Sequence, residues 1–133
     1  MRAVVIGVGH LGKHHARILA SLPGVSLVGV VDTDRERARQ VAAEHETTGY
    51  AELAQVSGKI DVAVVAVPTE SHARIALALI ESGVHTLIEK PVTQTLAEAD
   101  ALIAAAKSRG VVLAVGHSER FNPAVTAARP HLR

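Results

Sequence analysis

The stretch RAVVIGVGHLG, residues 2–12, decides the fold, because an apolar run of strand length breaks there into glycines spaced G-x-G-x-x-G. Gly7 permits a tight bend, and Gly9 lets the backbone approach a pyrophosphate. Gly12 lets the following helix pack closely on the strand, with its N-terminal N–H groups aimed at the anion. The stretch therefore predicts a phosphate-binding turn between a strand and a helix.

The glycine pattern alone is weak evidence for dinucleotide binding, but the residues that follow it strengthen this interpretation. A second apolar run, Val25 to Val31, comes after the predicted helix, and Asp32 stands about 20 residues past the last glycine. A carboxylate at this place can accept a hydrogen bond from the ribose 2′-OH of NAD and repel the 2′-phosphate of NADP. We therefore predict a dinucleotide-binding fold that favours NAD.

Two alternatives stay open around Asp32. Arg35, Arg37 and Arg39 follow it closely and can accommodate the 2′-phosphate of NADP, although a solvated helix face is the more ordinary interpretation of such a charge run. Asp32 can also cap the next helix, a role open equally to the two residues after it. NAD is thus the expected cofactor, and NADP remains possible.

Composition narrows the class of protein. The chain has 133 residues, 48% of them hydrophobic, which suffices for one domain with a sizeable core. Its net charge of +1 comes from mixed charges without a basic stripe, so neither nucleic acid nor a membrane surface is an expected partner. No apolar run approaches the roughly 20 residues that span a bilayer. The chain has no cysteine, and Met1 leads directly into the first strand, so we expect a cytoplasmic protein.

Strand-length apolar runs alternate with segments of helical period along the whole chain. This alternation is typical of strand–helix–strand units around a parallel sheet. We therefore predict an α/β fold, a Rossmann-type doubly wound parallel sheet in three α/β/α layers. The predicted strands are Arg2 to Ile6, Val25 to Val31, Thr47 to Tyr50, Asp61 to Ala66, Thr86 to Glu89 and Val111 to Val115. The predicted helices are His10 to Leu22, Asp34 to His45, Ala51 to Val56, Glu70 to Ser82 and Leu96 to Arg109.

Three of these helices have apolar faces that we expect to pack on the sheet, because their large apolar residues recur at helical spacing. The same periodicity predicts which side chains form the core. The predicted core residues are Leu11, Ile18, Leu19 and Leu22 in the first helix, Ile75, Leu79 and Ile80 in the fourth, and Leu96, Leu102 and Ile103 in the last.

Polar and special residues follow several of the predicted strands. Ligands of such sheets bind beyond the carboxyl ends of the strands, so these segments are the candidate site. Pro68 fixes a turn without an N–H and lets the loop lie close to a flat ring, and Thr69 can donate to a ribose, although a plain turn explains both equally well. The candidate segments are Gly7 to Gly12, Asp32 to Asp34, Val67 to His72, Glu89 to Pro91 and Gly116 to Pro123.

Taken together, these motifs resemble the Gfo/Idh/MocA oxidoreductases over essentially the whole chain. Glu89-Lys90-Pro91 is the most discriminating element, because many dinucleotide enzymes share the glycine turn. The resemblance implies an NAD(P)-binding domain over residues 1–120 and, over residues 121–133, the start of a link into a second α+β domain that supplies much of the substrate pocket. We therefore expect this chain to be part of a longer protein, inactive by itself and self-associating through that second domain.

The resemblance also implies the site residues. Lys90 is the expected catalytic residue, as general acid/base or substrate orienter, because oxidising an alcohol by hydride transfer needs a group that takes the hydroxyl proton. Burial and the positive charge of oxidised nicotinamide would both favour its neutral form. The ordinary alternative is a surface lysine at a strand end. The expected cofactor-binding residues are Gly7, Gly9, His10, Leu11, Gly12, Asp32, Val67, Pro68, Thr69, His72, Glu89, Lys90 and Arg120.

The histidines are not expected to bind a metal or carry protons. His10 and His14 are four residues apart, but no carboxylate is placed to complete a metal site. We interpret His15 and His72 as packed, hydrogen-bonded residues rather than proton carriers. Near the end of the chain, Arg120 and Asn122 can reach nicotinamide or substrate or cap the helix after Pro123, and Phe121 can anchor the loop under the sheet edge.

Three functions fit these residues. The first is the cofactor half of an NAD(P)-dependent dehydrogenase that interconverts a secondary alcohol and a ketone on a sugar, inositol or nucleotide-sugar. The second is a dinucleotide-binding or redox-sensing module without turnover, and the third is a reductase of imine-type or biliverdin-like substrates. Glu89-Lys90-Pro91 favours an enzyme, because a sensor has no use for a base beside nicotinamide.

Overall fold

A computed structural model describes residues 1–56 and 58–131, so the last two residues of the expected link, 132–133, lie outside the described residues. Its core is one parallel sheet of six strands in the order β3-β2-β1-β4-β5-β6. This arrangement confirms the predicted Rossmann-type α/β fold. The strands are β1 (Arg2–Ile6), β2 (Ser26–Val31), β3 (Gly49–Tyr50), β4 (Val62–Val65), β5 (His85–Ile88) and β6 (Leu113–Val115).

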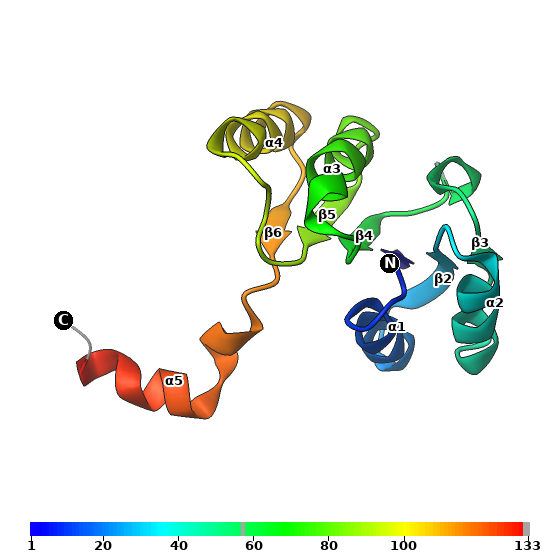
Figure 1. Ribbon diagram of the computed structural model, residues 1–133, viewed down its shortest axis with the longest axis horizontal. Helices are drawn as coiled ribbons and strands as arrows, with labels where there is room; N and C mark the ends of the chain where they lie inside the picture. The colour runs from blue at the N-terminus through cyan, green and yellow to red at the C-terminus, as the bar shows by residue number, and fades with distance from the viewer. Residues whose placement is uncertain (57, 132–133) are drawn as a thin grey trace.

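Helices cover both faces of the sheet, as predicted for three layers. In Figure 1, α1 and α2 lie on one side of the strands and α3 and α4 lie on the other. The last helix, α5, extends away from the body of the domain. The helices are α1 (Gly12–Ser21), α2 (Arg35–Glu44), α3 (His72–Glu81), α4 (Leu96–Arg109) and α5 (Pro123–Ala128), with 3-10 turns at Leu53–Val56, Thr69–Ser71, Ser118–Phe121 and Arg129–His131.

The central strand β1 explains why the sheet is so apolar. It pairs in parallel with β2 on one side and β4 on the other, and its residues Ala3–Ile6 are buried. A strand covered by helices on both faces has no polar face, so its sequence is a continuous apolar run rather than an alternation. The same reasoning holds for β4, where Ala63, Val64 and Val65 are buried.

The predicted element boundaries are correct to within a few residues. Helix α1 begins at Gly12 rather than at His10, so the glycine turn up to Leu11 stays outside the helix. Strand β5 ends at Ile88, which places Glu89 just beyond the strand rather than within it. The predicted helix from Glu70 is a 3-10 turn followed by α3.

The predicted apolar faces are partly wrong. Helix α1 buries Gly12 and Ala16, whereas Leu11, Ile18 and Leu22 are each 43% exposed. Small residues let this helix lie close to the sheet, and of the predicted large apolar residues only Leu19, which is partly buried, packs against the core. The prediction holds better in α3, where Ile75, Leu79 and Ile80 are buried, than in α4, where Leu102 is buried but Leu96 and Ile103 are exposed.

Helix α4 is closed at both ends by local interactions that the sequence encodes. The Thr95 hydroxyl accepts a hydrogen bond from the N–H of Glu98, whose carboxylate accepts one from the N–H of Thr95 in return. Gly110 ends the helix at φ +66°, a conformation that glycine adopts without strain. No helix in the described part of the chain is long and apolar enough to cross a membrane.

Candidate cofactor site

A cleft of about 800 Å³ lies beyond the carboxyl ends of β1, β2 and β4. The strand order reverses between β1 and β4, and ligands of open α/β sheets bind at this reversal. A second hollow of about 710 Å³ lies between α2 and β3 and contains none of the predicted site residues. The first cleft is therefore the candidate site. Its lining includes Gly7, Gly9, His10, Leu11, Asp32, Thr33, Arg37, Val67, Pro68, Ser71 and Arg74.

The three glycines of the turn are required for different reasons. Gly7 has φ +81°, and a Cβ there would stand 2.7 Å from the carbonyl oxygen of Ala66. A Cβ at Gly12 would collide with the carbonyl oxygen of Gly7. A Cβ at Gly9 would meet nothing within 4 Å, so the space beside it is part of the open cleft. Gly7 and Gly12 shape the turn, and Gly9 leaves room for a ligand.

The backbone of the turn fits an anion. Within residues 1–56 and 58–131, the N–H groups of Gly9, His10 and Leu11 have no protein acceptor. Helix α1 begins directly after them, and the start of a helix carries a partial positive charge. Unpaired N–H groups at a helix start form a cradle of the kind that holds a pyrophosphate.

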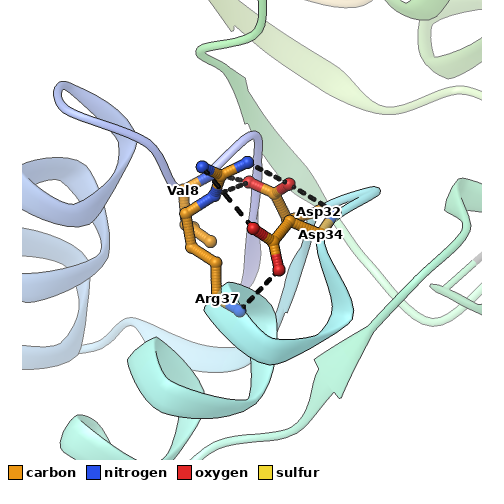
Figure 2. Close-up of polar contacts among 4 residues, drawn as sticks. All are labelled: Val8, Asp32, Asp34 and Arg37. Atoms are coloured by element: carbon orange, nitrogen blue, oxygen red, sulfur yellow. Dashed lines mark hydrogen bonds and ion pairs between the residues drawn. The ribbon is translucent and has the colours of Figure 1, made fainter.

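Asp32 lies at the cleft with a carboxylate that is 6% exposed. It accepts hydrogen bonds from the N–H groups of Val8 and Asp34, both at 2.9 Å (Figure 2). Burial raises the pKa of Asp32, but the hydrogen bonds from Arg37, Asp34 and Val8 outweigh it and lower the pKa below its ordinary value. The carboxylate is therefore ionised at neutral pH. Asp34, not Asp32, caps α2, because the Asp34 side chain accepts the N–H of Arg37.

The three arginines after Asp32 differ in their contact with that carboxylate. Arg37 donates from Nε and Nη2 to the two oxygens of Asp32, at 3.0 and 2.9 Å. Arg39 pairs with Glu36 on the exposed face of the helix, and both Arg35 and Arg39 line the second hollow. The interpretation as a solvated helix face is therefore correct for Arg39 and wrong for Arg37.

His72 holds together the loops that follow β4 and β5. Its side chain is buried, and its Nδ1 and Nε2 lie 2.9 Å from the carbonyl oxygens of Pro91 and Val67, respectively. A carbonyl oxygen only accepts hydrogen bonds, so at these contacts a ring nitrogen is the donor. His72 is thus a packed, hydrogen-bonded residue, as predicted, and it does not line the cleft.

Glu89 connects the end of β5 with α1. Its Oε1 lies 2.7 Å from Nε2 of His15, and its Oε2 accepts the N–H of Lys90 at 3.1 Å. A Cβ at Gly116 would stand 3.1 Å from Oε1, so the chain after β6 also passes close to this carboxylate. Glu89 therefore supports the backbone of Lys90 rather than lining the cleft.

Several predicted residues lie away from the cleft lining. Lys90 is exposed, so the burial expected for it is not found in this chain. Arg120 is exposed, and Asn122 caps α5 by accepting the N–H of Ala124. Phe121 is 82% exposed, so its interpretation as an anchor under the sheet edge is wrong. Gly12 and Thr69 begin α1 and a 3-10 turn beside the cleft without lining it.

Sequence reasoning missed Arg74, which stands in the first turn of α3 and lines the cleft. Ser71, which lies within the predicted segment Val67 to His72, lines it too. Arg74 follows Ser71 by three residues, and residues three apart lie on the same side of a helix. This spacing in the sequence could have identified Arg74 as a lining residue. The described residues contain no group of three or more histidine, cysteine, aspartate or glutamate side chains placed to hold a metal ion.

Comparison with known proteins assigns the family. The family model of Gfo/Idh/MocA proteins, described as an oxidoreductase family with an NAD-binding Rossmann fold, matches residues 1–117. The chain belongs to the Gfo/Idh/MocA family. Its glycine turn, its buried Asp32 and the cleft between them are thus parts of an NAD-binding Rossmann domain.

Similar proteins include dehydrogenases of the same family. UDP-N-acetylglucosamine 3-dehydrogenase of Acidithiobacillus ferrooxidans is 43% identical over 97% of this chain and 41% of its own length. Its solved structure, named GnnA, superposes with a TM-score of 0.92 over 98% of this chain and 43% of that one. The NAD(+)-dependent scyllo-inositol 2-dehydrogenase of Bacillus subtilis is 35% identical over 97% of this chain and 39% of its own length.

A third similar protein was solved together with the cofactor. GenD2 from gentamicin A biosynthesis, solved in complex with NAD, is 32% identical and superposes with a TM-score of 0.95 over 98% of this chain and 38% of that one. This Gfo/Idh/MocA chain therefore spans less than half the length of the relatives that it matches.

Proposed function

We propose that this domain is the cofactor-binding part of an NAD-dependent dehydrogenase that interconverts a secondary alcohol and a ketone on a sugar, an inositol or a nucleotide-sugar. The observation that carries the proposal is the arrangement of groups at one edge of the sheet. The anion cradle after β1 and the Asp32 carboxylate after β2 share a cleft, and Glu89 supports Lys90 after β5. The printed names of the relatives, which include UDP-sugar and inositol dehydrogenases, support the substrate class.

The residues have distinct proposed roles. The glycine turn binds the pyrophosphate, and Asp32 binds the adenosine ribose. When bound, NAD supplies the acceptor for the hydride that leaves the alcohol carbon. Lys90 takes the hydroxyl proton during oxidation and returns it during reduction. His72 and Glu89 position the loop that carries Lys90, through Pro91 O and the Lys90 N–H.

The first test is a titration of the 133-residue chain with NADH and separately with NADPH, followed by the fluorescence of the nicotinamide. We expect saturable binding in the micromolar range for NADH. Binding of neither dinucleotide by a folded chain would contradict the proposed cofactor role of the cleft.

Lys90 is tested in the full-length protein that the resemblance implies. Lys90→Ala is expected to abolish turnover of the sugar or inositol substrate and to leave the NADH affinity within severalfold, because the proposed role of the amine is in proton transfer. Lys107→Ala, which removes an exposed cation from α4 away from the cleft lining, serves as a comparison for the general effect of removing a cation. Near-normal turnover in Lys90→Ala would remove the catalytic role.

One observation favours a second candidate, a dinucleotide-binding module without turnover. The cleft of this chain is lined by the glycine turn and Asp32, which are proposed to hold the dinucleotide, whereas Lys90 lies outside its lining and is exposed. A full-length protein that binds NADH and reduces or oxidises none of a panel of sugars and inositols would support the module over the enzyme. The cytoplasmic location, the self-association and the domain boundary near residue 120 stay predictions.

A further inference from the structure

We propose that Arg37 competes with the adenosine ribose for Asp32 and thereby sets the preference between NADH and NADPH. The proposal rests on the proposed function, because it concerns the same cleft. Its basis is the set of hydrogen bonds that the Asp32 carboxylate already accepts within the protein.

Those hydrogen bonds use the full capacity of the carboxylate. Oδ1 accepts from Asp34 N and Arg37 Nη2, and Oδ2 accepts from Val8 N and Arg37 Nε. Figure 2 shows the carboxylate enclosed by these donors. A carboxylate has about four lone-pair sites for donors. A ribose hydroxyl can therefore donate to Asp32 only when one of the present donors leaves.

Arg37 is the donor that can leave. The N–H groups of Val8 and Asp34 belong to the backbone of the glycine turn and of the α2 cap, and Val8 is 1% exposed. Moving either would distort the turn or the helix. The Arg37 side chain is 46% exposed and borders the same cleft as Asp32, so its guanidinium can rotate away without moving the backbone.

Rotation of the Arg37 guanidinium away from Asp32 affects the binding of the two cofactors differently. The ribose of NADH brings a neutral hydroxyl, so its binding to Asp32 replaces two charge-assisted hydrogen bonds from Arg37 and offers the released guanidinium only a neutral oxygen as acceptor. NADPH brings a 2′-phosphate, and a guanidinium pairs with phosphate as well as it does with carboxylate. Arg37 therefore disfavours NADH and favours NADPH, in opposition to Asp32.

The test compares Arg37→Met with the unmodified chain in titrations with NADH and NADPH. Methionine keeps an unbranched side chain and a high helix propensity but has no charge. We expect NADPH to bind about tenfold more weakly, because its 2′-phosphate loses a charge-assisted pairing with the guanidinium. NADH should bind several-fold more tightly, because the Asp32 carboxylate is then free to accept the ribose hydroxyl. Arg37→Lys keeps the positive charge but cannot donate to both carboxylate oxygens in the same paired geometry. Its ratio of NADH affinity to NADPH affinity should lie between the ratios of Arg37→Met and the unmodified chain.

Arg35→Met is the matched control, because Arg35 is on the same helix but lines the second hollow. It should leave both affinities within twofold, and circular dichroism should show each variant folded. An unchanged affinity ratio in both Arg37 variants overturns the proposal while leaving the cofactor site intact. An equal loss of both affinities also overturns it, because Arg37 would then contact a part that the cofactors share. If the unmodified chain binds neither cofactor, the proposed function itself fails.

Discussion

At the scale of single residues, the glycine turn separates folding from binding. Gly7 and Gly12 leave no space for a side chain, because a Cβ at either position would meet backbone atoms. Gly9 faces open space, so a side chain there would occupy the cleft and leave the turn undisturbed. One motif thus contains two residues needed by the fold and one needed by the ligand.

Gly9→Val is accordingly expected to block NADH binding in a chain that remains folded. The valine side chain would fill the space next to N–H groups that are proposed to hold the pyrophosphate. The measurement is NADH titration together with far-ultraviolet circular dichroism. Gly12→Ala provides the contrast, since its Cβ would collide with Gly7 O and should destabilise the fold. NADH affinity within twofold of the unmodified chain in Gly9→Val would refute the role assigned to this turn.

At the scale of elements, a buried histidine fastens two loops that the sheet alone does not connect. β4 and β5 pair along their length, but the segments after them leave the sheet, where no strand pairing holds them. His72, at the start of α3, bonds to a carbonyl in each segment. The loop that carries Lys90 is therefore held relative to the cleft by a side chain.

His72→Ala should lower the free energy of unfolding by about 2–4 kcal/mol, because it removes the buried ring that contacts the carbonyl groups of Pro91 and Val67 and creates a cavity. Urea denaturation measures this loss. His14→Ala, which removes an exposed histidine from α1, is the matched control and should change stability by less than about 0.5 kcal/mol. A loss as small as that of the control would mean that the two loops are held in some other way.

At the scale of the whole molecule, acid stability depends partly on the strand ends opposite the cleft. Arg2 at the start of β1 donates from its side chain and its backbone N–H to Asp61, which precedes β4. These interactions with Arg2 lower the pKa of Asp61 from 3.8 to about 2. Because the pKa in the folded state is below the unfolded value, ionised Asp61 stabilises the fold above about pH 4, and this contribution is lost as the pH falls towards about 2.

Asp61→Asn should therefore make the urea midpoint less dependent on pH between about 4 and 2. Part of the dependence should remain, since the pKa of Asp32 is lowered as well and its contribution is lost in the same direction. Asp100→Asn removes an exposed carboxylate of α4 that has no ion pair within the described residues. The slope of its urea midpoint against pH should equal that of the unmodified chain. Equal slopes in all three proteins would rule out this role of Asp61.

The sequence by itself determined the type of fold and the location of the phosphate-binding turn. Apolar runs, helical periodicity and glycines act over a few neighbouring residues, so their pattern can be interpreted without knowing the rest of the molecule. It also placed Asp32 at the candidate site, because the spacing from the glycine turn to the end of the second strand follows from the fold. The alternative in which Asp32 only caps a helix was decided later, by the contact of Asp34 with Arg37 N.

Tertiary structure decided which side chains meet. The sequence pattern did not distinguish the three arginines that follow Asp32. The orientation of α2 relative to the sheet brings only Arg37 of the three into contact with Asp32. His15 and Glu89 are 74 positions apart, and His72 and Pro91 are 19 apart. Such contacts depend on how strands and helices are placed in three dimensions, which local sequence patterns do not encode. Exposure of Leu11 and Ile18 likewise followed from the close packing of Gly12 and Ala16, which helical periodicity alone does not reveal.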